Sequence, residues 1–194
     1  MCRQSRHLGL QKERREMFRE VPVLPVVVPV AAVVFIALLA HLRHRGLLSV
    51  PRAAVALAIC VYVAGVVANT VFPIFLDKPR RDVPWSTFVN LVPLVDYEVA
   101  DAVMNVVVFV PFGVLVPVLL VRASWSRVAG ASAAFSLTIE ATQLVTARLL
   151  GGGHVADVND LMFNVLGGVV GFGLVVAASR VPRVAAVIEP FRWR

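Results

Sequence analysis

The chain has 194 residues, of which 59% are hydrophobic and only 16% are charged, whereas soluble globular proteins carry about 25% charged residues. This composition and the mean hydropathy of +0.82 exclude an ordinary soluble domain and predict an integral membrane protein. The net charge of +7 would suggest nucleic acid as a partner of a soluble protein. Here the basic residues lie mostly in termini and loops, where they serve as topology signals and contact lipid head groups. We expect membrane lipids as partners and no nucleic acid.

Five apolar runs are each close to the about 20 residues that cross about 30 Å of hydrocarbon. Within a bilayer such runs must be helices, because every backbone polar group needs an internal partner. We therefore predict an all-α protein, an integral membrane helical bundle with about five transmembrane helices, over residues 21–178. The runs are Val21–Ala40, Ala53–Leu76, Ala102–Val121, Val128–Ala147 and Leu161–Ala178.

Two basic segments flank this domain. Residues 1–20 form an N-terminal tail that is either disordered or, if synthesis starts at Met17, mostly untranslated, and residues 179–194 form a C-terminal tail. The first apolar run is followed by further spans, so we interpret it as a retained helix.

Nine of the 19 Lys and Arg fall on the C-terminal side of the membrane. A start at Met17 would leave five on the other side and favour a cytoplasmic C-terminus; the full tail favours the reverse.

Glu140 is the only charged residue inside the five runs. A carboxylate at the centre of a membrane costs roughly 2.5–3.5 kcal/mol on insertion scales, so it usually serves a site or joins helices. Gln143 lies three residues further on and shares its helix face. Asp157, Asp160 and Asn164 are spaced to share one face at the start of the fifth run.

The second and fourth connections lie on the same side of the membrane, because two spans separate them. Polar residues from three helices therefore converge near that surface, and we predict a polar binding site there. Its residues are Asn105, Glu140, Gln143, Arg148, Asp157, Asp160 and Asn164.

Each acidic residue has a structural and a functional interpretation. Glu140 either joins helices through Arg148, Asn105 or Asn164, or binds a proton, a cation or a substrate. Asp157 and Asp160 either cap the fifth helix or form a carboxylate pair for a metal ion or acid–base chemistry. The spacing matches no metal-site motif, so we expect no metal and no cofactor.

The glycines and nucleophiles add little chemistry. Gly151–Gly153 lacks the Lys and Ser or Thr of a phosphate-binding loop and is interpreted as a flexible loop. Gly167-x3-Gly171 is typical of close helix packing. No catalytic triad can be identified, so the catalytic residues stay unknown.

The ordered polar set resembles the VanZ-like family of bacterial membrane proteins. The resemblance covers roughly Asn69 to Ala178, with its motif core at residues 90–171. It rests on Asn90-x2-Pro93, Asn105-x3-Phe109-x-Pro111-x-Gly113, Glu140-x2-Gln143, Arg148 and Asp157-x2-Asp160-x3-Asn164-x2-Gly167-x3-Gly171. Two features depart from the pattern. Leu150–His154 is extra sequence before Asp157, and Leu94 stands where an aromatic residue is common.

The family is named for a protein linked to resistance to the glycopeptide teicoplanin. The resemblance implies a multi-pass protein of the bacterial plasma membrane and cell envelope that modulates susceptibility to glycopeptide or lipopeptide antibiotics. We expect it to bind an amphiphilic molecule, a lipid-linked cell-wall precursor or a glycopeptide at the polar site. Two alternatives stay open: a membrane hydrolase or transferase acting on a lipid-linked substrate, and a cation- or proton-coupled transporter.

Overall fold

The structure is a computed structural model that describes residues 18–77, 83–95, 97–150 and 155–193. Within these residues five helices are long and apolar enough to cross a membrane, which confirms the all-α bundle. They are α2 (Val23–His44), α3 (Val50–Thr70), α4 (Val99–Leu119), α5 (Trp125–Leu149) and α6 (Val158–Ser179).

The helix ends follow local sequence signals. Pro22 is the N-cap residue of α2, a position that needs no backbone N–H partner. The Ser124 hydroxyl accepts from the Arg127 N–H at 3.3 Å and caps α5. The second predicted span is too long: α3 ends at Thr70 rather than Leu76. Pro73 follows this end, and the residue before a proline disfavours helical backbone.

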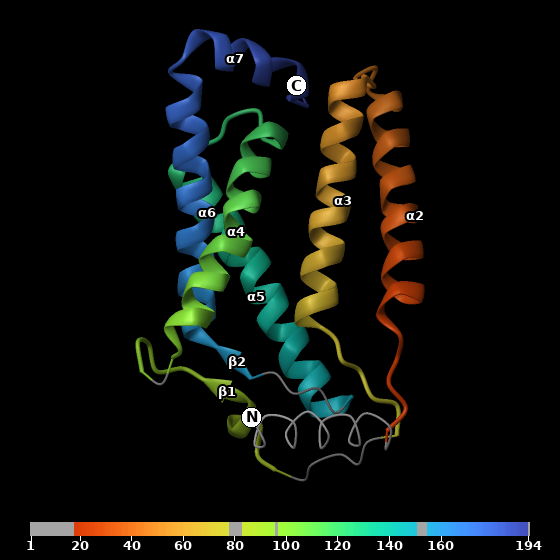
Figure 1. The fold of residues 1–194 in the computed structure, drawn as a ribbon, viewed down its shortest axis with the longest axis vertical. Coiled ribbons are helices and arrows are strands. Elements are labelled where there is room, and N and C mark those ends of the chain that lie inside the picture. Colours follow the sequence, from red (N-terminus) through yellow and green to blue (C-terminus); the bar gives the residue numbers. More distant parts are fainter. Residues whose placement is uncertain (1–17, 78–82, 96, 151–154, 194) are drawn as a thin grey trace, which may run out of the picture.

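The helices form a group of three and a pair. In Figure 1, α6 runs beside α4 and α5, while α2 packs against α3. Glycines allow α4 and α6 to approach closely. A Cβ added at Gly167 would collide with the Val106 carbonyl, and one at Gly171 with the Val110 carbonyl. The packing interpretation of Gly167-x3-Gly171 is therefore confirmed.

An aromatic cluster connects α3 with α4 and α5. It contains Tyr62, Phe109, Phe112 and Phe135, and the rings of Phe112 and Phe135 stack with centroids 5.0 Å apart. Phe109 is among the most deeply buried side chains, with 1% of its surface exposed. Aromatic packing of this kind gives the centre of the bundle a rigid apolar core.

The second and fourth connections meet at one end of the bundle, as predicted. The second connection contains the short helix η1 (Trp85–Phe88) and the strand β1 (Val89–Asn90). This strand pairs in parallel with β2 (Ala156–Asp157), with Asn90 opposite Asp157. Figure 1 shows both strands beside the beginning of α6.

The C-terminal segment lies at the opposite end of the bundle. It forms α7 (Pro182–Ile188) and η2 (Glu189–Phe191). The Arg52 guanidinium donates from Nε to the Arg192 carbonyl at 2.8 Å, and the Trp193 N–H donates to the Val118 carbonyl at 3.0 Å. These bonds tie the segment to both α3 and α4.

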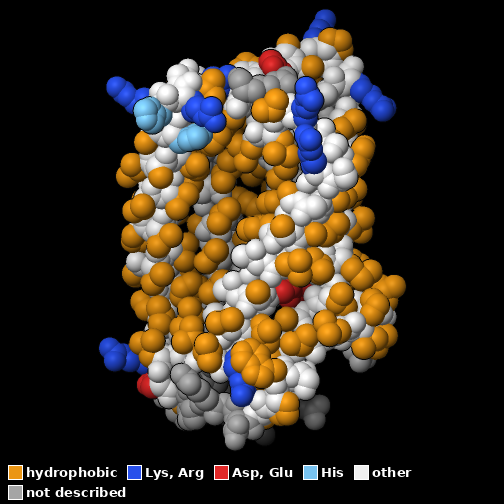
Figure 2. All heavy atoms as spheres, turned by 180° about the vertical axis from the view of Figure 1, so that it is seen from behind, with side chains coloured by type: hydrophobic (Ala, Val, Ile, Leu, Met, Phe, Trp, Pro, Cys, Tyr) orange, Lys and Arg blue, Asp and Glu red, His pale blue; other side chains and the backbone are white. Residues whose placement is uncertain are grey.

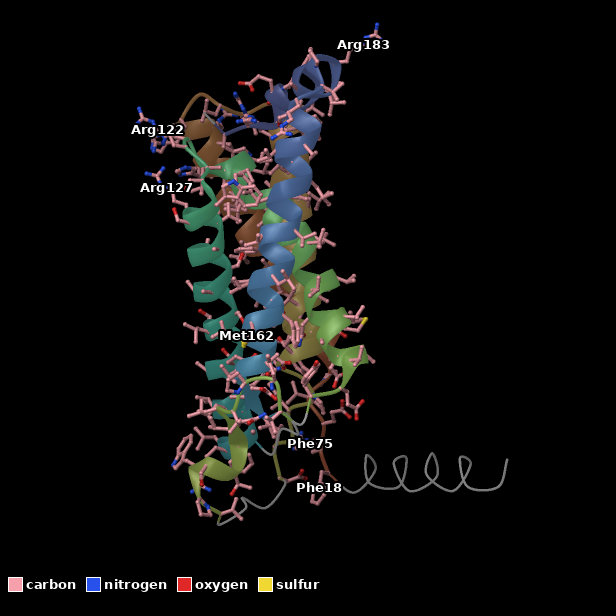
Figure 3. The ribbon with its side chains drawn as sticks, turned by 90° about the vertical axis from the view of Figure 1, so that its left-hand side faces the viewer. Phe18, Phe75, Arg122, Arg127, Met162 and Arg183 are labelled. Carbon is pink, nitrogen blue, oxygen red and sulfur yellow. The ribbon has the colours of Figure 1, made fainter. Side chains whose placement is uncertain are left out.

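The surface has the character of a membrane-spanning bundle. Figure 2 shows hydrophobic side chains over the long sides of the molecule and basic side chains gathered at its two ends. In Figure 3, Arg122, Arg127 and Arg183 lie at one end, and Phe18 and Phe75 lie at the other. Such an apolar surface with polar ends matches a bilayer core between two head-group layers.

Candidate functional site

Glu140 lies in the last part of α5 and holds the start of α6. Its Oε2 accepts a hydrogen bond from the backbone N–H of Asp157 at 2.9 Å, and the side chain is 8% exposed. In the described residues this bond replaces the predicted ones to Arg148, Asn105 or Asn164. A helix start leaves backbone N–H groups without intrahelical partners, and here a side chain from a neighbouring helix supplies one.

Asp157 is the N-cap residue of α6, which confirms its structural interpretation. Its Oδ1 accepts from the Asn159 N–H at 2.8 Å, and its Oδ2 accepts from Asn90 Nδ2 at 3.0 Å. Both carboxylate oxygens therefore have donors. The second bond joins β1 to the start of α6, so Asp157 fixes the loop as well as the helix.

Asn159 was missed by the sequence analysis, although it lies between the two acidic residues. It is 1% exposed; its Oδ1 accepts from the Leu94 N–H at 2.6 Å and its Nδ2 donates to the Val95 carbonyl at 3.3 Å. Leu94 has a φ of 61°, a left-handed conformation that is uncommon for a residue with a side chain. The two bonds hold this turn against α6.

Asp160 and Asn164 each join α6 to a neighbouring helix. Asp160 Oδ1 accepts from Asn105 Nδ2 of α4 at 2.6 Å. Asn164 Nδ2 donates to the Ser136 hydroxyl of α5 at 2.9 Å. Polar bonds of this kind contribute to helix association inside a membrane.

Side chains of α3, α4, α5 and α6 line a cavity of about 500 Å³ that is open on one side. We call it the α3–α6 cavity. Five of the seven predicted site residues line it: Asn105, Glu140, Gln143, Asp160 and Asn164. Most of the remaining wall is apolar and includes Val66, Phe109 and Ile139 of the core.

The cavity wall also contains polar residues of α3 that the sequence analysis did not assign. Asn69 Nδ2 donates to the Gly65 carbonyl at 2.8 Å, and the Thr70 hydroxyl donates to the Val66 carbonyl at 2.8 Å. The predicted span continued to Leu76, so Asn69 and Thr70 were expected inside an apolar helix and not at its polar end. Tyr62 of α3 also lines the cavity.

Three buried polar atoms on cavity-lining side chains have no hydrogen-bond partner among the described residues. They are Gln143 Oε1, Asn164 Oδ1 and the Tyr62 hydroxyl. Gln143 is 7% exposed and Asn164 is 4% exposed. A buried polar atom without a partner costs about 1–3 kcal/mol, so a ligand or water that pairs with it gains that energy.

Arg148 and Asp157 do not line the cavity. The Arg148 guanidinium donates to the Val83 carbonyl and lies over the Trp85 ring, 5.3 Å from its centroid, so it fixes η1. Gly151–Gly153 and His154 lie outside the described residues. Within the described chain, no group of three or more His, Cys, Asp and Glu side chains is close enough to hold a metal ion.

The family model described as VanZ/LLP1 matches residues 53–179. The chain belongs to the VanZ-like family. The match begins in α3 and ends with α6, so the family region contains the four helices that line the cavity. Together with the five apolar helices, it identifies a VanZ-like multi-pass membrane protein. A search of curated proteins and a search of solved structures each return no match.

Proposed function

We propose that this VanZ-like protein binds an amphiphilic or lipid-linked molecule of the bacterial cell envelope in the α3–α6 cavity. The cavity itself is the observation that supports this proposal. Glu140, Asp160, Gln143 and Asn164 line it, and the amide oxygens of the last two have no partner among the described residues, while most of the other lining residues are apolar. Small-molecule sites are commonly cavities of about 300–1,000 Å³ with apolar walls and a few polar groups.

The exposure of the lining residues supports entry from the lipid. Val61 of α3 and Met104 of α4 are 64% and 59% exposed, and both border the cavity. Gly65 and Pro111 are exposed as well. Because these residues lie in membrane-spanning helices, an amphiphile could enter between α3 and α4 with its chain still in the bilayer.

The consequence for antibiotics follows from the family resemblance. Glycopeptide and lipopeptide antibiotics act on lipid-linked molecules at the bacterial plasma membrane or carry lipid chains themselves. A protein that binds either partner would change how much drug meets its target. We propose that the chain modulates susceptibility in this way.

The test blocks the cavity with one side chain. Gly65 borders the cavity and has open space where a Cβ would be added, so Gly65→Phe would fill the opening without a backbone collision. Gly130 of α5 has the same open space and does not line the cavity, so Gly130→Phe is the matched control. Native mass spectrometry of protein purified from bacterial membranes would count retained amphiphiles, and teicoplanin inhibition would be measured in cells.

We expect wild type and Gly130→Phe to retain an amphiphile and to change teicoplanin susceptibility equally, and Gly65→Phe to do neither. Retention and susceptibility that are the same in Gly65→Phe as in wild type would contradict the proposal. The pair of carboxylates in one cavity also keeps acid–base chemistry open. Release of a chemically altered amphiphile by wild type would favour the hydrolase or transferase alternative.

A further inference from the structure

We infer that the α3–α6 cavity selects a headgroup rich in hydrogen-bond donors, such as an ammonium or a set of hydroxyls, and disfavours a phosphate. The inference rests on the proposed function, because it names the class of ligand for the same cavity. It follows from the balance of donors, acceptors and charges in the wall.

Three side-chain donors of the wall are already engaged, whereas the Tyr62 hydroxyl has no partner among the described residues. Asn105 Nδ2 donates to Asp160, and Asn69 Nδ2 donates to the Gly65 carbonyl. The Thr70 hydroxyl donates to the Val66 carbonyl. A ligand that presented only acceptor atoms would have to compete for these three donors or pair with the Tyr62 hydroxyl, which can donate as well as accept.

The acceptors of the wall are in excess. Gln143 Oε1 and Asn164 Oδ1 have no partner among the described residues, and both side chains are more than nine-tenths buried. Glu140 and Asp160 add carboxylates to the same wall. An ammonium group has three donors and a sugar ring has several hydroxyl donors, so either suits a wall that holds two carboxyl groups.

The charges of the wall point in the same direction. Among the described residues that line the cavity, none is Lys, Arg or His. Arg148, the basic residue of α5 next to this region, contacts Val83 and Trp85. Among the described lining residues a phosphate would therefore meet two carboxyl groups and no basic side chain, and juxtaposed like charges discriminate strongly against a ligand.

The experiment compares three probes with the same dodecyl chain: dodecylamine, dodecyl glucoside and dodecyl phosphate. Each would be titrated into the full-length protein held in amphipol, with heat as the readout. Three proteins are needed: wild type, Gly65→Phe with its opening filled, and the Glu140→Gln/Asp160→Asn double variant. Binding that Gly65→Phe abolishes is cavity binding.

We expect cavity binding of the amine, the glucoside or both to be at least about tenfold tighter than that of the phosphate in wild type. The double variant should lose affinity for the amine more than for the glucoside. Cavity binding of dodecyl phosphate as tight as that of the other probes would overturn the inference and leave the proposed function standing. Absence of cavity binding by all three probes would overturn both.

Discussion

Glu140 and Asp157 are joined by one hydrogen bond, but their surroundings give the two side chains different roles. One oxygen of Asp157 accepts from Asn90 of β1 and the other from the Asn159 N–H of its own helix, and its side chain does not line the cavity. Glu140 uses one oxygen for the Asp157 N–H and lines the cavity. The structural role of Glu140 therefore needs an acceptor, whereas the proposed binding role needs its charge.

Substitutions at Glu140 can separate these two roles. In Glu140→Gln the amide oxygen can still accept from the Asp157 N–H, so we expect wild-type membrane abundance and weaker binding of dodecylamine. Glu140→Ala leaves that N–H without a partner, which costs about 1–3 kcal/mol, so we expect lower abundance. Immunoblotting of membranes and amine titration check the two results. Equal amine affinity in Glu140→Gln and wild type would remove Glu140 from the proposed site.

Gln143 offers a test with the opposite effect on stability. Its Oε1 is buried without a partner among the described residues, so Gln143→Met removes an unsatisfied acceptor while keeping the side-chain volume. We expect the thermal unfolding temperature of the ligand-free protein to rise or stay the same, and the affinity for donor-rich probes to fall. A large loss of stability would show that this amide is needed for packing instead.

At the scale of the helices, the contact between α4 and α6 depends on the absence of side chains. We expect Gly167→Ala to separate the two helices and to lower membrane abundance, because its Cβ would collide with the Val106 carbonyl. Gly130→Ala adds the same methyl group in open space and is the control. The difference should be at least about 1–3 kcal/mol, the usual cost of forcing extra volume into a packed core. Equal unfolding in denaturant would contradict this contact.

The turn that carries Leu94 depends on a side chain of α6. Asn159→Ala would leave the Leu94 N–H and the Val95 carbonyl without their partners, so we expect the turn to loosen while the helices stay packed. Limited proteolysis should then cleave residues 91–95 faster than in wild type. Leu94→Gly should suppress part of this effect, because glycine adopts a positive φ without strain.

The helices and their convergence could be predicted from the sequence, because apolar length and the parity of spans determine both. The partners of the polar side chains could not. Glu140 bonds to a backbone N–H, which no spacing rule identifies, and Asn159 acts through a turn 65 residues away. Arg148 was predicted to lie at the site, but it stands near the end of the 25-residue helix α5, outside the cavity lining, and contacts Trp85 of η1.

For the whole molecule, the α2–α3 pair meets the other three helices mainly through the aromatic cluster and the C-terminal segment. The α3–α6 cavity lies where α3 faces α4, α5 and α6. This arrangement lets the opening lie at a boundary between two helical units, where small shifts change its width at low cost in packing. The proposed site therefore combines fixed polar bonds on α6 with a wall, α3, that is less firmly packed.

The orientation of the molecule determines which leaflet of the membrane can supply a ligand to this cavity. In the described residues the α7 end carries most of the arginines, whereas the site end carries Arg19 and Arg148. Over the whole sequence with a start at Met17, the count is nine Lys and Arg at the α7 end against five at the site end, so the positive-inside rule predicts that the site end faces outward; the basic tail before Met17 favours the reverse. With the site end facing outward, a lipid-linked envelope molecule would be reached from the outer leaflet.

Cysteine labelling in intact cells tests this orientation. Leu91 at the site end and Val121 at the α7 end are 75% and 67% exposed, so each can be replaced by Cys in a Cys2→Ser background, with Cys60 left buried. We expect a membrane-impermeant maleimide to label Leu91→Cys in intact cells and Val121→Cys only after permeabilisation. The reverse pattern would place the cavity at the cytoplasmic leaflet, and the proposed ligand would then have to be a lipid-linked molecule before its export.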